Sequence, residues 1–212
     1  MKQIDFDHGT VTGNILGVAL PMLVAQILSL LYNIVDRIYI ARIPSVGTTA
    51  LGAVGLCFPI IVIITAFSNL FGSGGAPLFS INRGKGNIKK AEAIMNTSFS
   101  MLCICGVALM VIGMLFASPI LVLFGASEEG LSYAYPYMMI YLIGTVPSMI
   151  ATGMNPFINA QGYATSGMLS VTIGAVANLI LDPLFIFGLN LGIKGAAIAT
   201  IISQTLSAAY VF

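Results

Sequence analysis

Five long stretches of this chain contain no Asp, Glu, Lys or Arg, and they limit the possible folds more than any motif does. They cover residues 9–35, 43–82, 93–127, 130–181 and 195–212. Each stretch reaches, or nearly reaches, the ~20 residues that a transmembrane helix requires. With 58% hydrophobic and only 7% charged residues, the chain lacks the charged surface of a water-soluble domain. We therefore predict an all-α, polytopic membrane protein.

The longest charge-free stretch is expected to hold two helices, because a cluster of turn-forming residues (NAQGYATSG) interrupts it at 159–167. Pro147 and Pro156 are expected to bend the first of the two. The prediction is a bundle of six transmembrane helices, at about residues 14–41, 51–75, 92–117, 133–158, 167–188 and 193–212.

The basic residues predict an orientation in the membrane. Lys2 precedes the first helix, and Arg83, Lys85, Lys89 and Lys90 follow the second, so five of the eight basic residues fall on one side. Because cytoplasmic loops carry an excess of Lys and Arg, the N-terminus and the 83–90 loop are expected to be cytoplasmic. We expect an integral protein of the plasma (inner) membrane.

Two acidic residues, Asp36 and Asp182, lie next to or within long apolar runs. An acid in the hydrocarbon region costs roughly 2.5 to 3.5 kcal/mol on insertion scales, so such residues commonly mark ion, proton or substrate pathways. At ~1.5 Å per residue from the cytoplasmic ends of their helices, both acids fall in the outer half of the membrane. The pair therefore favours a transport function.

Polar residues also share one face on two of the predicted helices. On the first helix this face contains Gln26, Ser29, Asn33 and Asp36, with Arg37 beside them, and on the fourth it runs from Tyr133 to Asn159. Small and polar residues are common at packing surfaces between transmembrane helices, which is the alternative interpretation of each face. Two such faces favour a central cavity, and its predicted lining is Gln26, Asn33, Tyr137, Tyr141, Asn155 and Asn159.

The fifth and sixth helices predict a cation site. Asn178 and Asp182 lie one turn apart on the same face, and Pro183 is expected to loosen the helix and free backbone carbonyls. On the sixth helix, Thr200 offers a hydroxyl and Ala196 a carbonyl from a shared face. These oxygens suit Na⁺, while the aspartates alone could instead carry a proton. The remaining alternative is that Asp182 forms an ion pair with Arg37 or Lys194.

Several other functions are disfavoured by the sequence. The basic residues are too few and too scattered for a nucleic-acid interface. No nucleophile and base form a defensible catalytic arrangement, so we expect neither an enzyme nor a bound cofactor, with Na⁺ or H⁺ only as a coupling ion. Cys57, Cys103 and Cys105 lie in apolar segments and are expected to act as small packing residues.

Six short segments resemble the multidrug and toxic compound extrusion (MATE) family in their order and spacing. Together they extend over most of the chain. They are ALPM at 19–22, DR at 36–37, GKGN at 84–87, NAQG at 159–162, NLILDP at 178–183 and GIKGAAIAT at 192–200.

The resemblance implies a cation-coupled exporter of amphipathic, often cationic, compounds. It implies that Asp36, Asn178, Asp182, Ala196 and Thr200 form the cation or proton site of the first lobe, and that Pro21 marks a bend in the first helix. Family members have twelve helices in two lobes, so the resemblance implies that this chain is the N-terminal lobe alone. On this basis the C-terminal lobe is absent, the chain is truncated, and it is expected not to transport by itself.

Two alternatives to a drug exporter stay open. A flippase for lipid-linked saccharides, from the same superfamily, would need a cationic cavity for a pyrophosphate group, and only Arg37 is a plausible intramembrane cation. A non-transporting half-subunit or membrane scaffold would agree with the truncation and with the packing interpretation of both polar faces.

Overall fold

The computed structural model describes residue 4 and residues 10–211, and these form a bundle of helices. The predicted all-α class is confirmed by this part of the chain. The elements are α1 (Val11–Ala41), α2 (Gly47–Gly84), α3 (Ile88–Leu123), α4 (Glu128–Ile143), α5 (Thr145–Ala160), α6 (Ala164–Pro183), the π-helix η1 (Leu184–Gly188) and α7 (Ile193–Val211).

Polar side chains fix the beginning of three helices. Thr10, Asn87 and Ser127 accept hydrogen bonds from backbone amides three residues later, at 3.2, 3.2 and 3.1 Å. Such caps satisfy amides that have no partner inside the helix. Glu128 and Glu129 follow the Ser127 cap in the first turn of α4, where their negative charges interact favourably with the positive end of the helix dipole.

The second and third helices are longer than predicted. α2 was expected at 51–75, but it continues to Gly84 because its glycines serve close packing and do not end the helix. A Cβ at Gly72 would overlap the backbone of Gly153 on α5, and one at Gly75 would lie 2.7 Å from the Phe157 ring. α3 was expected at 92–117, but it begins after the Asn87 cap and continues past Pro119.

The helix predicted at 133–158 is two helices in the structure. α4 begins earlier, at Glu128, and ends at Ile143, and α5 begins at Thr145, with a bend of 57° between them. Gly144 occupies the break, and Pro147 lies in the first turn of α5, where its missing N–H costs no intrahelical bond. The segment is therefore bent, but the bend is centred on Gly144, and Pro147 and Pro156 both lie within α5.

Loosening of the chain after Asp182 takes the form of a π-helix. Pro183 ends α6 and cannot donate a backbone hydrogen bond. The following residues form η1, in which the Leu189 amide donates to the Leu184 carbonyl at 2.8 Å. Single π turns of this kind often occur at functional sites.

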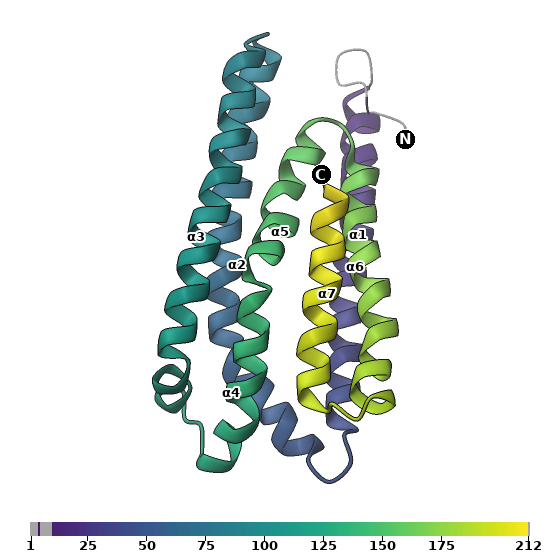
Figure 1. The fold of residues 1–212 in the computed structure, drawn as a ribbon. Helices are drawn as coiled ribbons and strands as arrows, with labels where there is room; N and C mark the ends of the chain where they lie inside the picture. The colour runs from purple at the N-terminus through teal and green to yellow at the C-terminus, as the bar shows by residue number, and fades with distance from the viewer. Residues whose placement is uncertain (1–3, 5–9, 212) are drawn as a thin grey trace.

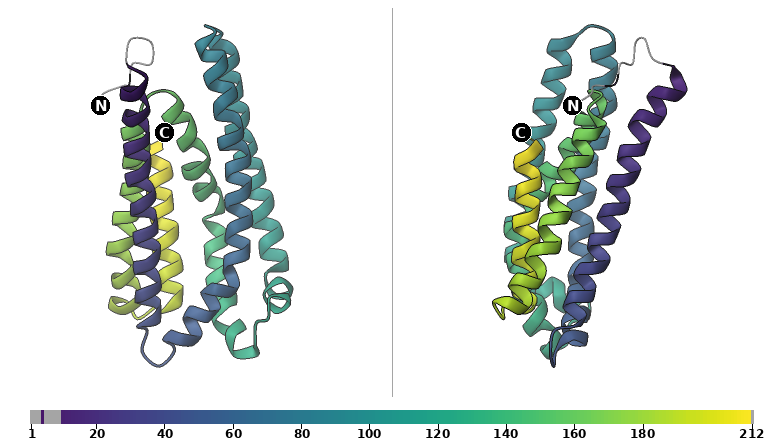
Figure 2. Two further views of the ribbon diagram at one scale, coloured as in Figure 1. Left: turned by 180° about the vertical axis from the view of Figure 1, so that it is seen from behind. Right: turned by 90° about the vertical axis from the view of Figure 1, so that its right-hand side faces the viewer.

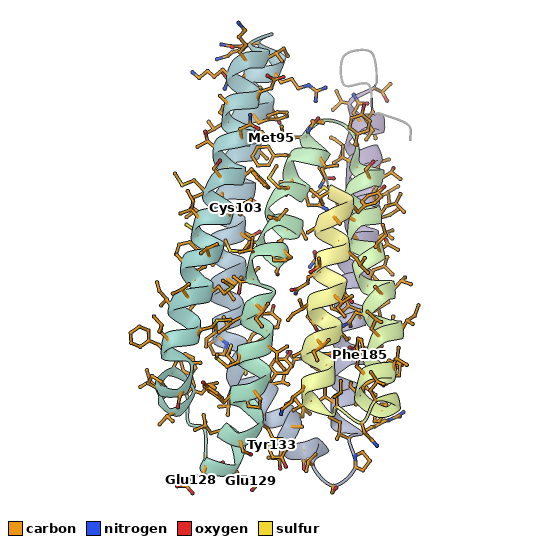
Figure 3. The ribbon with its side chains drawn as sticks, in the orientation of Figure 1. Met95, Cys103, Glu128, Glu129, Tyr133 and Phe185 are labelled. Carbon is orange, nitrogen blue, oxygen red and sulfur yellow. The ribbon has the colours of Figure 1, made fainter. Side chains whose placement is uncertain are left out.

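The helices form two groups that lie side by side in the bundle (Figure 1). α1, α6 and α7 make one group, and α2, α3, α4 and α5 make the other, with α5 and α4 also packing against α7. The α2–α3 turn lies at the same end as the α5–α6 turn, while the α1–α2, α3–α4 and α6–α7 turns lie at the other end (Figure 2). Glu128 and Glu129 mark that second end in Figure 3.

Large apolar side chains cover the outside of the bundle. Leu70, Ile104 and Leu115 are 61%, 63% and 71% exposed, an arrangement that only a lipid environment accommodates at this scale. α1, α2, α3 and the α6–η1 segment are long and apolar enough to cross a membrane, and the bent α4–α5 pair would be a fifth span. The chain is therefore an integral membrane protein.

α7 differs from these spans in composition. It corresponds to the helix predicted at 193–212, but it carries Ser203, Gln204, Thr205 and Ser207 within 19 residues. Ser203 and Ser207 are buried against neighbouring helices, together with Ala196 and Ala197. The polar side of α7 thus faces the bundle, as expected for polar residues in a membrane protein.

Candidate functional site

A cavity of about 560 Å³ lies between the two groups of helices. α1, α2, α5, α6 and α7 all contribute to its lining. The polar residues that line it are Gln26, Ser29, Tyr32, Asn69, Ser73, Ser148, Thr152, Asn155, Asn159, Asn178, Thr200, Ser203, Gln204 and Ser207. Met22, Ala25 and Val171 are among its apolar residues, so the cavity combines apolar walls with uncharged polar groups.

The carboxyl groups of Asp36 on α1 and Asp182 on α6 lie within hydrogen-bonding range of each other. Asp182 is fully buried, and Asp36 is half-buried. Carboxylates only accept hydrogen bonds, so a bond between the two requires a proton on one of them, and a cation between them would serve the same purpose. The pair is therefore a candidate site for a proton or a cation.

Each carboxyl group also keeps one oxygen without a donor in the described part of the chain. These atoms are Asp36 Oδ1 and Asp182 Oδ2. The predicted ion pair of Asp182 with Arg37 or Lys194 is not seen among the described residues. Asp182 is fully buried and both bases are exposed, and the guanidinium carbon of Arg37 lies 5.7 Å from the centroid of the Phe58 ring. The hydroxyls of Tyr32 and Tyr137 are close enough to the carboxyl pair to interact with its charge.

Asn178 joins the carboxyl pair to the cavity. Its Nδ2 donates to Asp182 Oδ1 at 3.1 Å, as the spacing of one turn on α6 predicts. Its Oδ1 has no donor among the described residues, and Asn178 itself lines the cavity. One buried side chain therefore contacts the acid on one side and borders the cavity on the other.

The two remaining predicted ligands lie on α7. Ala196 is fully buried, and its carbonyl oxygen already accepts a hydrogen bond from the Thr200 hydroxyl at 2.9 Å. Thr200 lines the same cavity as Asn178. The structure thus brings Asp36, Asn178 and Asp182 together, and it places Thr200 and Ala196 on the helix that packs against α6.

Three of the predicted cavity residues lie elsewhere. Asn33 is exposed, and its amide donates to the Ser29 carbonyl of its own helix at 2.7 Å. Tyr137 and Tyr141 are buried on α4, with ring centroids 6.2 Å apart in a stacked arrangement. The break at Gly144 explains the error for the tyrosines, because it turns α5 away from the direction of α4 and only the α5 half of the predicted face lines the cavity.

Other lining residues were missed by the sequence prediction. Tyr32 on α1 was not among the predicted residues, although it lines the cavity together with Ser29. Asn69 and Ser73 on α2 also line the cavity, and their spacing of four residues is the helical signal that was overlooked. Gln26, Asn155 and Asn159 line the cavity as predicted.

Comparisons with known proteins place these features in a family context. A family model described as MatE matches residues 21–184. A FAD transporter of Shewanella oneidensis is 31% identical over 204 residues, which cover 92% of this chain and 44% of that protein. The multidrug export protein MepA of Staphylococcus haemolyticus is 29% identical over 202 residues, covering 95% of this chain and 44% of that protein.

A solved structure shows the same arrangement of helices. It is the outward-facing conformation of a multidrug resistance MATE family transporter of the MOP superfamily, with a TM-score of 0.89 and 26% identity, covering 96% of this chain and 44% of that chain. The chain therefore spans less than half the length of the relatives that it matches, and it corresponds to one lobe of that transporter.

Proposed function

We propose, from the premise that this chain belongs to the MatE family of transporters, that it forms the cation-coupled half of an exporter of amphipathic, drug-like compounds. Family membership places it among transport proteins and not among enzymes. The export itself, its substrates and its coupling ion are proposed for a protein of the relatives' full length.

The observation that carries the proposal is the position of Asn178 between Asp182 and the cavity. In the proposed mechanism Na⁺ or a proton neutralises the Asp36 and Asp182 pair. Neutralisation removes the need for Asn178 to donate to a charged carboxylate, and it changes the packing of α1, α6 and α7. The cavity then loses affinity for its ligand, because the ligand and the coupling ion favour different arrangements of the same helices.

The remaining predicted ligands have a supporting role in this mechanism. Thr200 and Ala196 would add a hydroxyl and a carbonyl oxygen to a bound Na⁺, after the Thr200 hydroxyl turns away from Ala196. Pro21 lies within the continuous helix α1, and its proposed role is to let α1 bend when the pair is neutralised. We propose that the protein lies in the plasma membrane with its N-terminus in the cytoplasm, as the basic residues predict.

The lining of the cavity gives less support to a flippase for lipid-linked saccharides. A pyrophosphate group needs cationic side chains, and none of the described residues that line the cavity is charged. Arg37 is exposed and does not line it.

Release of a bound fluorescent amine tests the proposal. The purified chain in lipid nanodiscs is titrated with dansylcadaverine, and Na⁺ or acid is then added. A rise in the dissociation constant of about tenfold is expected if coupling is worth a typical 1–3 kcal/mol. A membrane scaffold without transport function would show neither saturable binding nor ion-dependent release, and that result would refute the proposal.

A further inference from the structure

Two asparagines that line the cavity, Asn159 and Asn178, are oriented so that their nitrogens bond to the protein and their oxygens are left over. Four buried oxygens of residues that line the cavity have no hydrogen-bond donor among the described residues. They are Asn159 Oδ1, Asn178 Oδ1, Ser203 Oγ and Gln204 Oε1. A buried acceptor without a donor is costly, so these atoms call for a ligand or for water.

The orientation of the first amides is fixed by a chain of hydrogen bonds. Asn155 Nδ2 lies 2.8 Å from the Gly167 carbonyl oxygen, which can only accept. Asn155 must therefore present its oxygen to Asn159, whose Nδ2 donates to it at 3.0 Å. The remaining atom of the Asn159 amide is its oxygen, and flipping either amide would place two donors or two acceptors together.

Asn178 is fixed in the same way, because its nitrogen donates to Asp182 Oδ1, an acceptor, and its own oxygen is left over. On α7, Gln204 Oε1 and the Ser203 hydroxyl oxygen also have no partner among the described residues. The cavity thus offers the amide oxygens of Asn159 and Asn178, whose nitrogens are engaged, and two further unpaired oxygens on α7.

The unpaired oxygens favour some of the amphipathic compounds over others as ligands of the cavity. A ligand with N–H groups satisfies several of these oxygens, and a positive charge on its nitrogen strengthens each bond. A nitrogen that is fully alkylated has no N–H to donate, and an anion would be repelled by the unpaired oxygens of Asn159, Asn178 and Gln204. We infer that the cavity prefers organic ammonium compounds with N–H groups over fully alkylated ammonium compounds and over anions, an inference that rests on the proposed binding of amphipathic compounds at this site.

A matched pair of probes tests this preference. Dansylcadaverine carries a primary ammonium, and its N,N,N-trimethyl derivative has the same fluorophore and charge without N–H donors. Both are titrated into the purified chain in nanodiscs at neutral pH and constant Na⁺. We expect the primary ammonium to bind at least about tenfold more tightly, because hydrogen bonds to charged groups are the stronger class.

Variants show whether the unpaired oxygens cause the preference. Ser203→Ala and Gln204→Met each remove one acceptor, and each should reduce the preference about threefold to tenfold by weakening the binding of the primary ammonium more than that of the trimethyl probe. Thr172→Val is the matched control, since the Thr172 hydroxyl bonds to the Met168 carbonyl of its own helix at 2.9 Å and does not line the cavity.

The possible outcomes separate this inference from the proposed function. Equal binding of the two probes, or tighter binding of the trimethyl probe, overturns the inference and leaves the proposed function intact. A preference that survives both acceptor variants also overturns it, because the unpaired oxygens then hold only water. Absence of saturable binding for either probe refutes the proposed function and the inference with it.

Discussion

Asn178 Nδ2 donates a hydrogen bond of 3.1 Å to Asp182 Oδ1, while the other end of the same amide is free of donors in the described part of the chain. Asp182 in turn lies within hydrogen-bonding range of Asp36 on α1. A change of charge at the carboxyl pair therefore acts on a side chain that borders the cavity. This connection is short enough to couple the two sites without a rearrangement of the whole bundle.

Replacing either aspartate by asparagine should uncouple ligand release from the ion. Asn keeps the size of Asp but can neither hold the coupling proton nor neutralise Na⁺. In Asp36→Asn and Asp182→Asn variants, we expect the ion-induced change in dansylcadaverine affinity to fall from about tenfold to less than about twofold.

The same two variants should also be tested in a transporter that contains this chain and has the full length of the relatives. There, Na⁺-driven or proton-driven drug export from vesicles should be lost. Glu128→Gln removes an exposed acid at the end of the bundle and is the control that should retain coupling. Wild-type coupling in both aspartate variants would exclude the carboxyl pair as the ion site.

Removing the Asn178 amide should destabilise the protein. Asn178→Ala leaves Asp182 Oδ1, a buried acceptor, without its donor, and the expected loss is about 1–3 kcal/mol of unfolding free energy. The loss of stability is measured by thermal unfolding in detergent, which is monitored as the loss of the monodisperse peak in size-exclusion chromatography. Asn82→Ala is the comparison, because its amide bonds only to the Leu78 carbonyl at an exposed position. Equal melting temperatures for the two variants would show that the buried bond is unimportant.

Gly72 and Gly74 on α2 give a matched pair for the packing of α2 against α5. A Cβ at Gly72 would lie 2.8 Å from the Gly153 Cα, whereas one at Gly74 would have no atom within 4 Å. Overpacking typically costs about 1–3 kcal/mol, while alanine is otherwise favoured over glycine in a helix by about 0.5–1 kcal/mol. Gly72→Ala should therefore lower the melting temperature and Gly74→Ala should not. The reverse order would contradict this description of the α2–α5 contact.

The membrane orientation can be tested by cysteine labelling. Lys85 lies in the α2–α3 turn and Glu128 begins α4, at opposite ends of the bundle (Figures 1 and 3). In a background in which Cys57, Cys103 and Cys105 are replaced by serine, a membrane-impermeant maleimide added to intact cells should label Glu128→Cys and not Lys85→Cys. Permeabilised cells provide the control, in which both sites should react. Labelling of Lys85→Cys alone in intact cells would invert the orientation.

Hydrophobic patterning predicts the order and approximate positions of the long apolar segments, because charge-free length is a property of the chain alone. It does not show that the segment predicted at 133–158 is two helices. The predicted C-terminal end of α2 was wrong for a tertiary reason. Gly72 and Gly75 look like helix breakers in the sequence, but their lack of a side chain is used for contact with α5. A rule based on local preference cannot separate these two uses of glycine.

In the candidate site, too, the features that depend on local spacing were predicted, and those that depend on helix packing were not. Asn178 and Asp182 form the expected bond because their spacing on one helix determines it. The approach of Asp36 depends on how α1 packs against α6, and the sequence suggested it only through the shared depth of the two acids. Tyr137 and Tyr141 were assigned to the cavity by extending one helical face across Gly144, and the 57° bend there invalidates that extension.

The unequal lengths of the helices have a consequence for the choice of bilayer. With 38 and 36 residues, α2 and α3 are ~57 and ~54 Å long, almost twice a typical ~30 Å hydrocarbon core. In a thicker membrane, part of the helix length that projects beyond the hydrocarbon core can therefore enter the bilayer. Among the apolar spans, the α6–η1 segment is the shortest, with 25 residues and a length of ~37 Å, so its reserve is much smaller. Hydrophobic mismatch in a thick bilayer would therefore act first on the segment that carries Asp182, which makes lipid thickness a variable to control in reconstitution.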